Sequence, residues 1–140
     1  MADHEDANLI LKLYDLRREA VMREARKWFA IEFHPNSAAD VMAALQGPNS
    51  AYLRMLAGYW EMVAALVLHD TIDAELFYDT TGEYMFFFAK VEPFLEDVRK
   101  QGGQPRMMKS LEKLVRQTPQ SAERLKSMRD NQRAMAQARP

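Results

Sequence analysis

The hydrophobic pattern is densest between residues 52 and 99, where two apolar segments flank a polar stretch at 69–73. In the first segment, apolar side chains recur every three or four residues on two adjoining faces, and only Arg54 and Glu61 interrupt them. This spacing predicts a helix from 51 to 69, and a helix that is apolar nearly all round is normally buried among others. We therefore expect this helix at the centre of the fold. Its two apolar faces are Leu53, Leu56, Trp60, Val63 and Val67, and Tyr52, Met55, Tyr59, Met62 and Leu66.

The second segment keeps helical spacing from residue 72 to residue 98. We favour one bent helix over two, although Thr80 and Glu83 have the spacing of a capping box and mark a rival break at 79–82. Pro93 cannot donate a backbone hydrogen bond and crowds the preceding turn, so a kink is expected there. Residues 51–69 and 72–100 would then form an antiparallel hairpin.

An aromatic run at residues 84–88 is more than one helix face can bury in its own domain. We expect part of it to face a second subunit or a ligand. Its members are Tyr84, Phe86, Phe87 and Phe88.

Before the central helix, the pattern predicts a long helix from Asp6 or Asn8 to Phe33, ended by the proline that follows His34. Ser37 then starts a short helix over 38–46. Gly47-Pro48 ends it, and Asn49 or Ser50 caps the central helix.

After the central segments, the glycines and proline of 101–105 predict a break, followed by a helix over 107–117. Beyond it, large apolar residues are scarce, so the segment can be helical but has little to anchor it. We expect residues 134–140 to be frayed or disordered. The chain would thus comprise a helical domain at 1–117 and a basic arm at 118–140.

Composition supports an all-α fold, which we expect to be a compact bundle of four or five helices. Leu, Met and Ala dominate, and the chain has no cysteine, which excludes disulfides and thiolate chemistry. The longest uninterrupted apolar run has seven residues, 62–68, far short of the roughly 20 that span a bilayer. The acidic N-terminus does not resemble a secretory signal. We expect a cytoplasmic protein with no transmembrane segment.

Charge is unevenly distributed along the chain. Residues 1–100 carry 17 acidic and 10 basic side chains, whereas residues 101–140 carry 3 and 9. Opposite fields attract at short range, so we expect the basic arm to dock on the acidic body of its own or a partner subunit. Nucleic acid and an anionic membrane surface are the alternatives. They are not favoured, since no aromatic residue follows Phe94 to stack on bases.

A set of residues between 55 and 116 forms a recognisable pattern: Ile72-Asp73, Tyr78, Gly82-Glu83-Tyr84, Pro93, Arg99, Gly102 and the apolar stretch from Leu111 to Leu114. This pattern resembles a family of small all-helical prokaryotic domains of unknown function, some of which sit beside a membrane anchor. Where the family has Trp ahead of its proline, this chain has Phe88 or Ala89. The resemblance implies an all-α bundle of bacterial origin, with no known activity or functional residues.

Candidate metal ligands cluster at the junction after the central helix, where His69, Asp70 and Asp73 are followed by three more acids. Imidazole and carboxylates are competent ligands. The tight Glu-x-x-His repeats of helical metal sites are absent, and acids at a helix start are expected from capping alone. The sequence also has no recognisable cofactor-binding motif, and we expect no cofactor.

Glu61 is the polar residue whose helix position most demands a partner. We first expect a structural ion pair with Arg54, Lys90 or Arg99, and second a ligand-binding carboxylate. In the second case Arg54, Tyr59, Trp60 and Tyr84 would complete the ligand site.

Two functions of different class follow. The favoured one is a non-catalytic helical interaction protein that self-associates, with a homodimer as the expected state. The alternative is a small-ligand or metal-dependent enzyme that uses the acidic cluster at 69–83.

Overall fold

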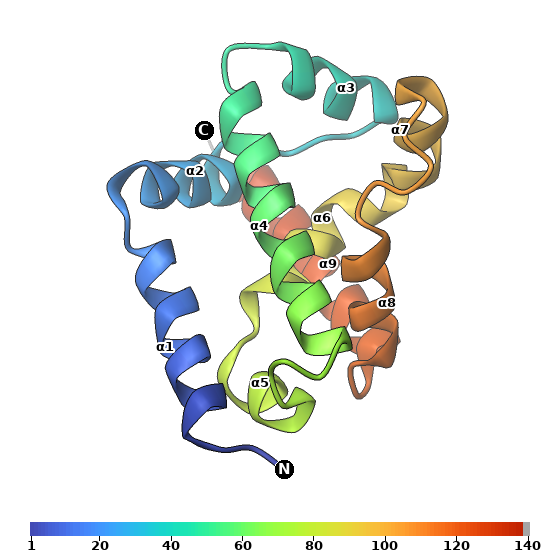
Figure 1. Cartoon of the computed structure of the whole chain (residues 1–140). Helices are drawn as coiled ribbons and strands as arrows, with labels where there is room; N and C mark the ends of the chain where they lie inside the picture. Colours follow the sequence, from blue (N-terminus) through green and yellow to red (C-terminus); the bar gives the residue numbers. More distant parts are fainter. Residues whose placement is uncertain (139–140) are drawn as a thin grey trace.

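Helices account for all the regular secondary structure in residues 1–138, the part of the chain that this computed structural model describes (Figure 1). The predicted all-α class is confirmed. Residues 1–138 form more helices than the four or five expected, because two predicted helices, the first one and that over 72–100, are each broken. The helices are α1 (His4–Arg17), α2 (Ala20–Ile31), α3 (Ala38–Gln46), α4 (Ser50–Leu68), α5 (Ala74–Thr80), α6 (Glu83–Val91), the 3₁₀ helix η1 (Glu92–Phe94), α7 (Leu95–Gly102), α8 (Lys109–Gln117) and α9 (Ser121–Ala138).

The central helix predicted over 51–69 is present as α4, and it runs through the middle of the molecule (Figure 1). Its largest contacts are with α8 and α2, and α3 lies across its upper end. The expected hairpin partner, residues 72–100, does not fold as one helix. Helices distant in sequence therefore take the place of that partner around α4.

Residues 72–100 form α5, α6, η1 and α7, and the preference for one bent helix is wrong. The rival break is the real one: Thr81 is extended at the end of α5. The Thr80 hydroxyl donates to the carbonyls of Leu76 and Phe77, which satisfies backbone groups at that terminus. The kink expected at Pro93 is present as η1, which separates α6 from α7.

The long first helix is also broken, between α1 and α2. The helix is interrupted at Glu19, whose carboxylate accepts the backbone N–H of Met22 and so caps α2. Glutamate is not a usual N-cap residue, so the sequence pattern did not predict a helix start at this position. The start also differs: Asp3, not Asp6 or Asn8, caps α1, in a reciprocal capping box with Asp6.

Polar contacts fasten α1 and α2 to the rest of the chain. Asp6 accepts the N–H of Asp73 at 2.7 Å, and the Tyr59 hydroxyl donates to a carbonyl of α1, that of Leu13, at 2.7 Å. At the α1–α2 corner, the Arg26 guanidinium forms a two-pronged ion pair with Glu83, at 2.7 and 2.8 Å. Such bidentate pairs fix orientation as well as adding energy.

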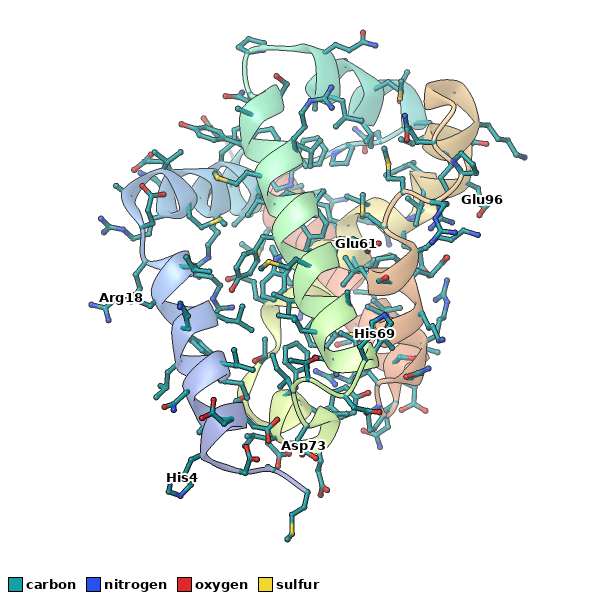
Figure 2. The ribbon with its side chains drawn as sticks, in the orientation of Figure 1. His4, Arg18, Glu61, His69, Asp73 and Glu96 are labelled. Carbon is teal, nitrogen blue, oxygen red and sulfur yellow. The ribbon has the colours of Figure 1, made fainter. Side chains whose placement is uncertain are left out.

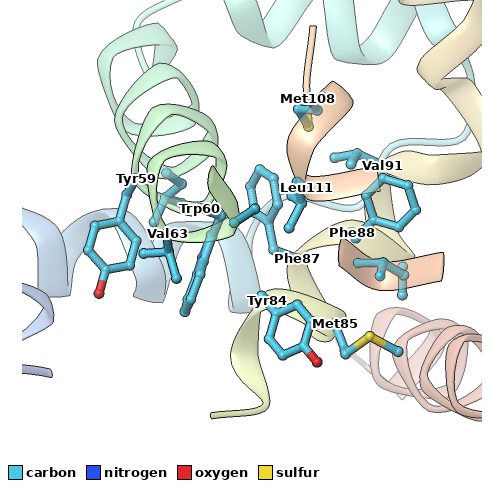
Figure 3. Close-up of a cluster of buried hydrophobic side chains, with 14 of the residues drawn as sticks. Tyr59, Trp60, Val63, Tyr84, Met85, Phe87, Phe88, Val91, Met108 and Leu111 are labelled. Carbon is cyan, nitrogen blue, oxygen red and sulfur yellow. The ribbon is translucent and has the colours of Figure 1, made fainter. Parts of the chain in front are cut away.

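The aromatic run of α6 lies inside the chain's own core (Figure 3). Tyr84, Phe87 and Phe88 are almost fully buried, and Phe86 is half-buried. Their neighbours include Trp60 of α4, whose ring lies 6.3 Å from that of Tyr84. The rings of this run are therefore packed within the chain and do not form an exposed aromatic surface for a second subunit or a ligand.

The C-terminal segment forms α9, which packs mainly along α6 and also touches α8. Leu125 of α9 is buried, and the Gln132 side chain of the same helix donates to the carbonyl of Phe86 at 3.0 Å. Residues 134–138, expected to be frayed or disordered, continue the helix. The same expectation for residues 139–140 lies outside the described residues.

Candidate functional site

A partly open cavity of about 260 Å³ lies beneath α3, lined by residues of α3, α4, α6, α7 and the loop before α8. An apolar cavity of roughly 150 Å³ is large enough to bind benzene, so this one can hold a larger organic group. A single lining residue is charged, Arg54. The lining comprises Val41, Leu45, Leu53, Arg54, Ala57, Val91, Leu95, Val98, Met107 and Met108.

The sequence of α3 explains how this space arises. Ser37 caps α3 at one end and Gly47 terminates it at the other, which limits the helix to nine residues. This short helix contacts both α4 and α7. Below it, Ala57 presents only a methyl group on the α4 wall, so the surrounding side chains do not fill the volume.

Arg54 places a positive charge on the wall of this cavity. Its Nη2 donates to the carbonyl of Leu45 at 2.8 Å, one of the carbonyls that α3 leaves unpaired at its C-terminus. Within residues 1–138 no carboxylate lies within 4.0 Å of the guanidinium. Arg54 is exposed, and a guanidinium has five N–H donors, so its remaining donors are open to solvent or to a ligand.

The opposite wall is the loop that ends in Met107 and Met108. Met108 has φ +56°, a left-handed conformation that is uncommon for a residue with a side chain. Arg99 holds the loop in place: its Nε and Nη2 donate to the Met107 carbonyl at 2.9 and 2.8 Å. The Arg99 guanidinium also pairs with Glu96 and Glu112, so the loop is fixed to α7 and α8 together.

Glu61 does not form the expected ion pair with Arg54, Lys90 or Arg99, and that first interpretation is wrong. Its carboxylate instead accepts the backbone N–H groups of Ser110 at 3.0 Å and Leu111 at 2.8 Å. These N–H groups belong to the first turn of α8, toward which Glu61 points from α4 (Figure 2). Glu61 thus acts as a cap for α8 supplied by another helix.

The remaining predicted ligand residues are not brought together at the cavity. Tyr59 is buried, with its hydroxyl bonded to α1, and burial raises its pKa to about 12. Trp60 lies in the core, and Tyr84 shares a 2.8 Å hydrogen bond with the Thr118 hydroxyl. Of the five residues predicted to bind a ligand, Arg54 alone lines the cavity.

Two of the predicted metal ligands, His69 and Asp73, lie near the lower end of α4 (Figure 2). Asp73 caps α5 by accepting the N–H of Leu76 at 2.9 Å, and Asp70 is a left-handed turn residue with φ +59°. His69 lines a separate surface hollow beside α8. In the described part of the chain, no three His, Asp or Glu side chains converge so that they could hold a metal ion.

A second hollow, of about 310 Å³, lies between α9, η1 and the turn at 34–36. Lys90 is part of its wall and is buried. Its ammonium donates to the Phe29 carbonyl at 2.5 Å and lies 4.7 Å from the centre of the Phe29 ring. Burial lowers the pKa of Lys90 to about 8. Sequence analysis missed this site, although a lysine inside the apolar run of residues 84–91 was a visible signal.

Residues 2–118 match the family described as Domain of unknown function (DUF4760). The chain belongs to this family. The match extends the resemblance seen over residues 55–116 and confirms its kind, a family without an assigned activity. No curated protein and no solved structure matches the chain.

The two hollows relate differently to the DUF4760 region. Every residue that lines the apolar cavity lies within the matched residues 2–118. The hollow beside Lys90 takes part of its wall from α9, which lies beyond them. The apolar cavity is therefore built wholly from the family domain.

Within the DUF4760 region, α4 is long and apolar enough to cross a membrane by length and composition alone. Core helices pass the same test, and α4 has the packed position of a core helix, with α2, α3 and α8 against it. The expectation that no segment spans a membrane, like that of a cytoplasmic location, stays a prediction.

Proposed function

We propose that this chain is a non-catalytic helical binding module whose ligand is a small organic carboxylate with an apolar tail. One observation carries the proposal: the cavity beneath α3 is apolar except for Arg54, and Arg54 has no carboxylate partner within residues 1–138. A ligand with one negative end and one apolar end matches both features.

The tail would gain free energy by leaving water. Burial of apolar surface contributes roughly 25 cal/mol per Å², and preformed apolar cavities with few polar groups are typical ligand sites. If about 150 Å³ holds the six carbons of benzene, a cavity of about 260 Å³ holds roughly ten. The proposed tail is therefore of medium length.

The carboxylate would bind the Arg54 guanidinium. Arginine and carboxylate match in shape and form two parallel hydrogen bonds, which are stronger than bonds between neutral groups. A single guanidinium balances a single negative charge, so a monocarboxylate fits better than a phosphate dianion. Arg54 also donates to a carbonyl at the C-terminal end of α3. A carboxylate bound to Arg54 would therefore lie next to α3, the helix that covers the ligand's tail.

The lining chemistry supports binding rather than catalysis. Apart from Arg54, the cavity wall has aliphatic and methionine side chains only. Arginine stays protonated in proteins and is a poor proton donor or acceptor in catalysis. The wall thus offers neither a nucleophile nor a general base.

The test is a thermal unfolding series with straight-chain carboxylates from butanoate to decanoate, each paired with the alcohol of equal length. The midpoint temperature should rise with chain length, and more for each carboxylate than for its alcohol. Arg54→Gln should remove the advantage of the carboxylate but keep the dependence on chain length. Ala57→Leu, which fills the cavity, should remove both effects.

A matched control is Arg18→Gln, which neutralises an exposed arginine distant from the cavity. Its response should equal that of the wild type. A series without any dependence on chain length, or one unchanged by Ala57→Leu, contradicts the proposal.

Self-association is a second candidate function, favoured by a different observation. Large apolar side chains are exposed mainly on α1 and α2: Leu11 is 67% exposed and Val21 is 52% exposed. Such side chains are candidates for contact with another chain. We propose a homodimer through α1 and α2, with Leu11 and Val21 in the contact. The other large apolar side chains exposed on these two helices are Tyr14, Leu16 and Ile31.

Sedimentation velocity tests this candidate. The wild type should dimerise at micromolar concentrations, and the double variant Leu11→Asp, Val21→Asp should be monomeric with an unchanged thermal midpoint. A monomeric wild type contradicts the dimer and leaves the cavity proposal untouched.

We also propose that the basic arm, 118–140, docks on its own chain. The contacts of α9 with α6 support this, as does an ion pair between Arg129 and Glu92. Docking is thereby favoured over nucleic acid as the partner of the arm.

A further inference from the structure

The hollow between α9 and the turn at 34–36 has a lining unlike that of the apolar cavity. Three of its residues carry positive charge, Lys90, Arg129 and Arg133, and no residue of the lining is acidic. Other polar side chains, among them His34 and Asn36, complete the wall. A concave site with this imbalance of charge concentrates anions.

Lys90 is the unusual member of this set. Its side chain comes from α6, where its neighbours are core aromatics, and only 7% of the residue is exposed. Within residues 1–138 no carboxylate lies within 4.0 Å of its ammonium. Lysines are almost never buried unless they are paired. The ammonium donates one hydrogen bond, to Phe29, and has two further N–H donors.

The arginines come from α9, on the opposite wall. Arg129 donates through Nε to the carbonyl of Ala89 at 3.0 Å and pairs with Glu92. Arg133 is more open: among residues 1–138 its one carboxylate contact is a 3.6 Å approach to Asp130 on the same helix. Exposed pairs of that length contribute little, so Arg133 can turn to a ligand at small cost.

We propose that this hollow binds a phosphate group, with the Lys90 ammonium and the Arg133 guanidinium as its two charged contacts. A phosphate dianion needs two positive charges and several N–H donors, and lysine and arginine together supply both. The site is separate from the apolar cavity and does not rest on the carboxylate proposal. It would also give the basic arm a role, since α9 provides Arg133.

The energetics favour occupation. A buried ammonium without a counter-ion is disfavoured by desolvation, and a bound anion would offset that cost. Phosphate should therefore bind and stabilise the folded chain, because any ligand that binds only the native state shifts unfolding. Chloride at equal ionic strength should not, since a single charge cannot bridge both walls.

The experiment uses the full chain and inorganic phosphate as the probe. Thermal midpoints are measured in phosphate and in sodium chloride of equal ionic strength, and ³¹P line widths report binding directly. We expect a phosphate-specific rise in the midpoint and broadening of the ³¹P signal. Lys90→Met should abolish both effects, and Arg133→Gln should weaken the apparent affinity at least tenfold. Lys12→Met, at an exposed position on α1, is the matched control and should behave as wild type.

Vesicles distinguish the two sources of a phosphate group. Vesicles with phosphatidic acid present a phosphomonoester, whereas phosphatidylserine vesicles present equal charge without one. Binding to the first alone, lost in Lys90→Met, supports the proposal and identifies a lipid headgroup as the source. Free phosphate that binds in solution, without vesicle binding, supports a soluble ligand.

The proposal is overturned by two results. One is the absence of any response to both free phosphate and phosphatidic acid that exceeds the matched salt or phosphatidylserine control. The other is a phosphate response that persists unchanged in Lys90→Met. If Lys90→Met does not fold, Arg133→Gln decides, because its partly exposed side chain is not needed in the core.

Discussion

The Glu61 carboxylate accepts the backbone N–H of Leu111 at 2.8 Å and so joins the central helix α4 to the start of α8. The same carboxylate accepts the N–H of Ser110. The residue at the N-cap position of α8, Met108, has no side-chain oxygen and makes no capping bond. A helix whose own sequence lacks a cap thus obtains one from a residue about 50 positions earlier.

Removal of this cap should destabilise the fold. Glu61→Ala should lower the free energy of unfolding by about 1.5–3 kcal/mol, because two backbone donors lose a charged acceptor. Glu61→Gln should lower it by less, since the amide oxygen can accept one of the bonds. Urea unfolding measures both, with Glu24→Gln at an exposed position of α2 as the control. Equal stability of Glu61→Ala and the wild type would show that the bonds carry no net stabilisation.

The position of Glu61 shows what the sequence could and could not predict. Helical spacing identified it as a polar residue that needs a partner, but the partner is backbone on α8. Local sequence spacing points to side-chain partners, whereas the tertiary fold decides which helix terminus reaches α4. Gly and Pro mark helix ends in the sequence, so the predicted bounds of α3 and α4 agree with the structure within a residue or two.

The missed features depend on contacts between distant segments. Glu19 caps α2 although glutamate is a weak predictor of helix starts, so the α1–α2 break was missed. The cavity beneath α3 takes its lining from helices and a loop spread over residues 41–108. No local pattern could assemble it, although Arg54 was identified as a candidate. The sequence indicates Lys90 only as a possible partner for Glu61.

The buried ammonium of Lys90 should make stability depend on pH. Its pKa in the folded chain is about 8, below the ordinary 10.5. Between these values the unfolded chain binds more protons, so stability should rise with pH. Between pH 7 and pH 10 the gain should be about 2 kcal/mol. Above pH 10 the raised pKa of Tyr59 acts in the opposite direction, because the unfolded tyrosine ionises first.

Denaturant unfolding in phosphate-free buffer from pH 7 to pH 10 measures this effect. Lys90→Met should be more stable than the wild type at pH 7 and should show a flat profile over the same range. A wild-type profile that is flat, or that falls from pH 8 to pH 10, would contradict the burial of an unpaired ammonium at this position.

Arg99 should control the loop wall of the apolar cavity. Arg99→Met removes both bonds to the Met107 carbonyl and the pairs with Glu96 and Glu112. We expect faster amide hydrogen exchange over residues 104–109 and a loss of about 2–4 kcal/mol in stability. Arg106→Met, an exposed neighbour, is the control. Unchanged exchange in that loop would show that Arg99 does not hold it.

The arm α9 should contribute to stability mainly through apolar burial. Leu125→Ala should cost about 2–4 kcal/mol, because Leu125 is 2% exposed. Deletion of residues 119–140 should lower the thermal midpoint further. High salt should reduce only the part due to ion pairs such as Arg129 with Glu92. A deletion with an unchanged midpoint would contradict docking of the arm on its own chain.

The cavity beneath α3 can be tested directly by nuclear magnetic resonance with ¹³C-methyl-labelled methionine and octanoate. Met107 and Met108 line the cavity, whereas Met62 and Met135 are exposed elsewhere and serve as internal controls. We predict intermolecular nuclear Overhauser effects from the octanoate tail to the methyl groups of Met107 and Met108, and none to the two controls. In Ala57→Leu these effects should vanish. Octanoate contacts confined to the exposed methionines, or none at any methionine, would contradict the assignment of this cavity as a ligand site.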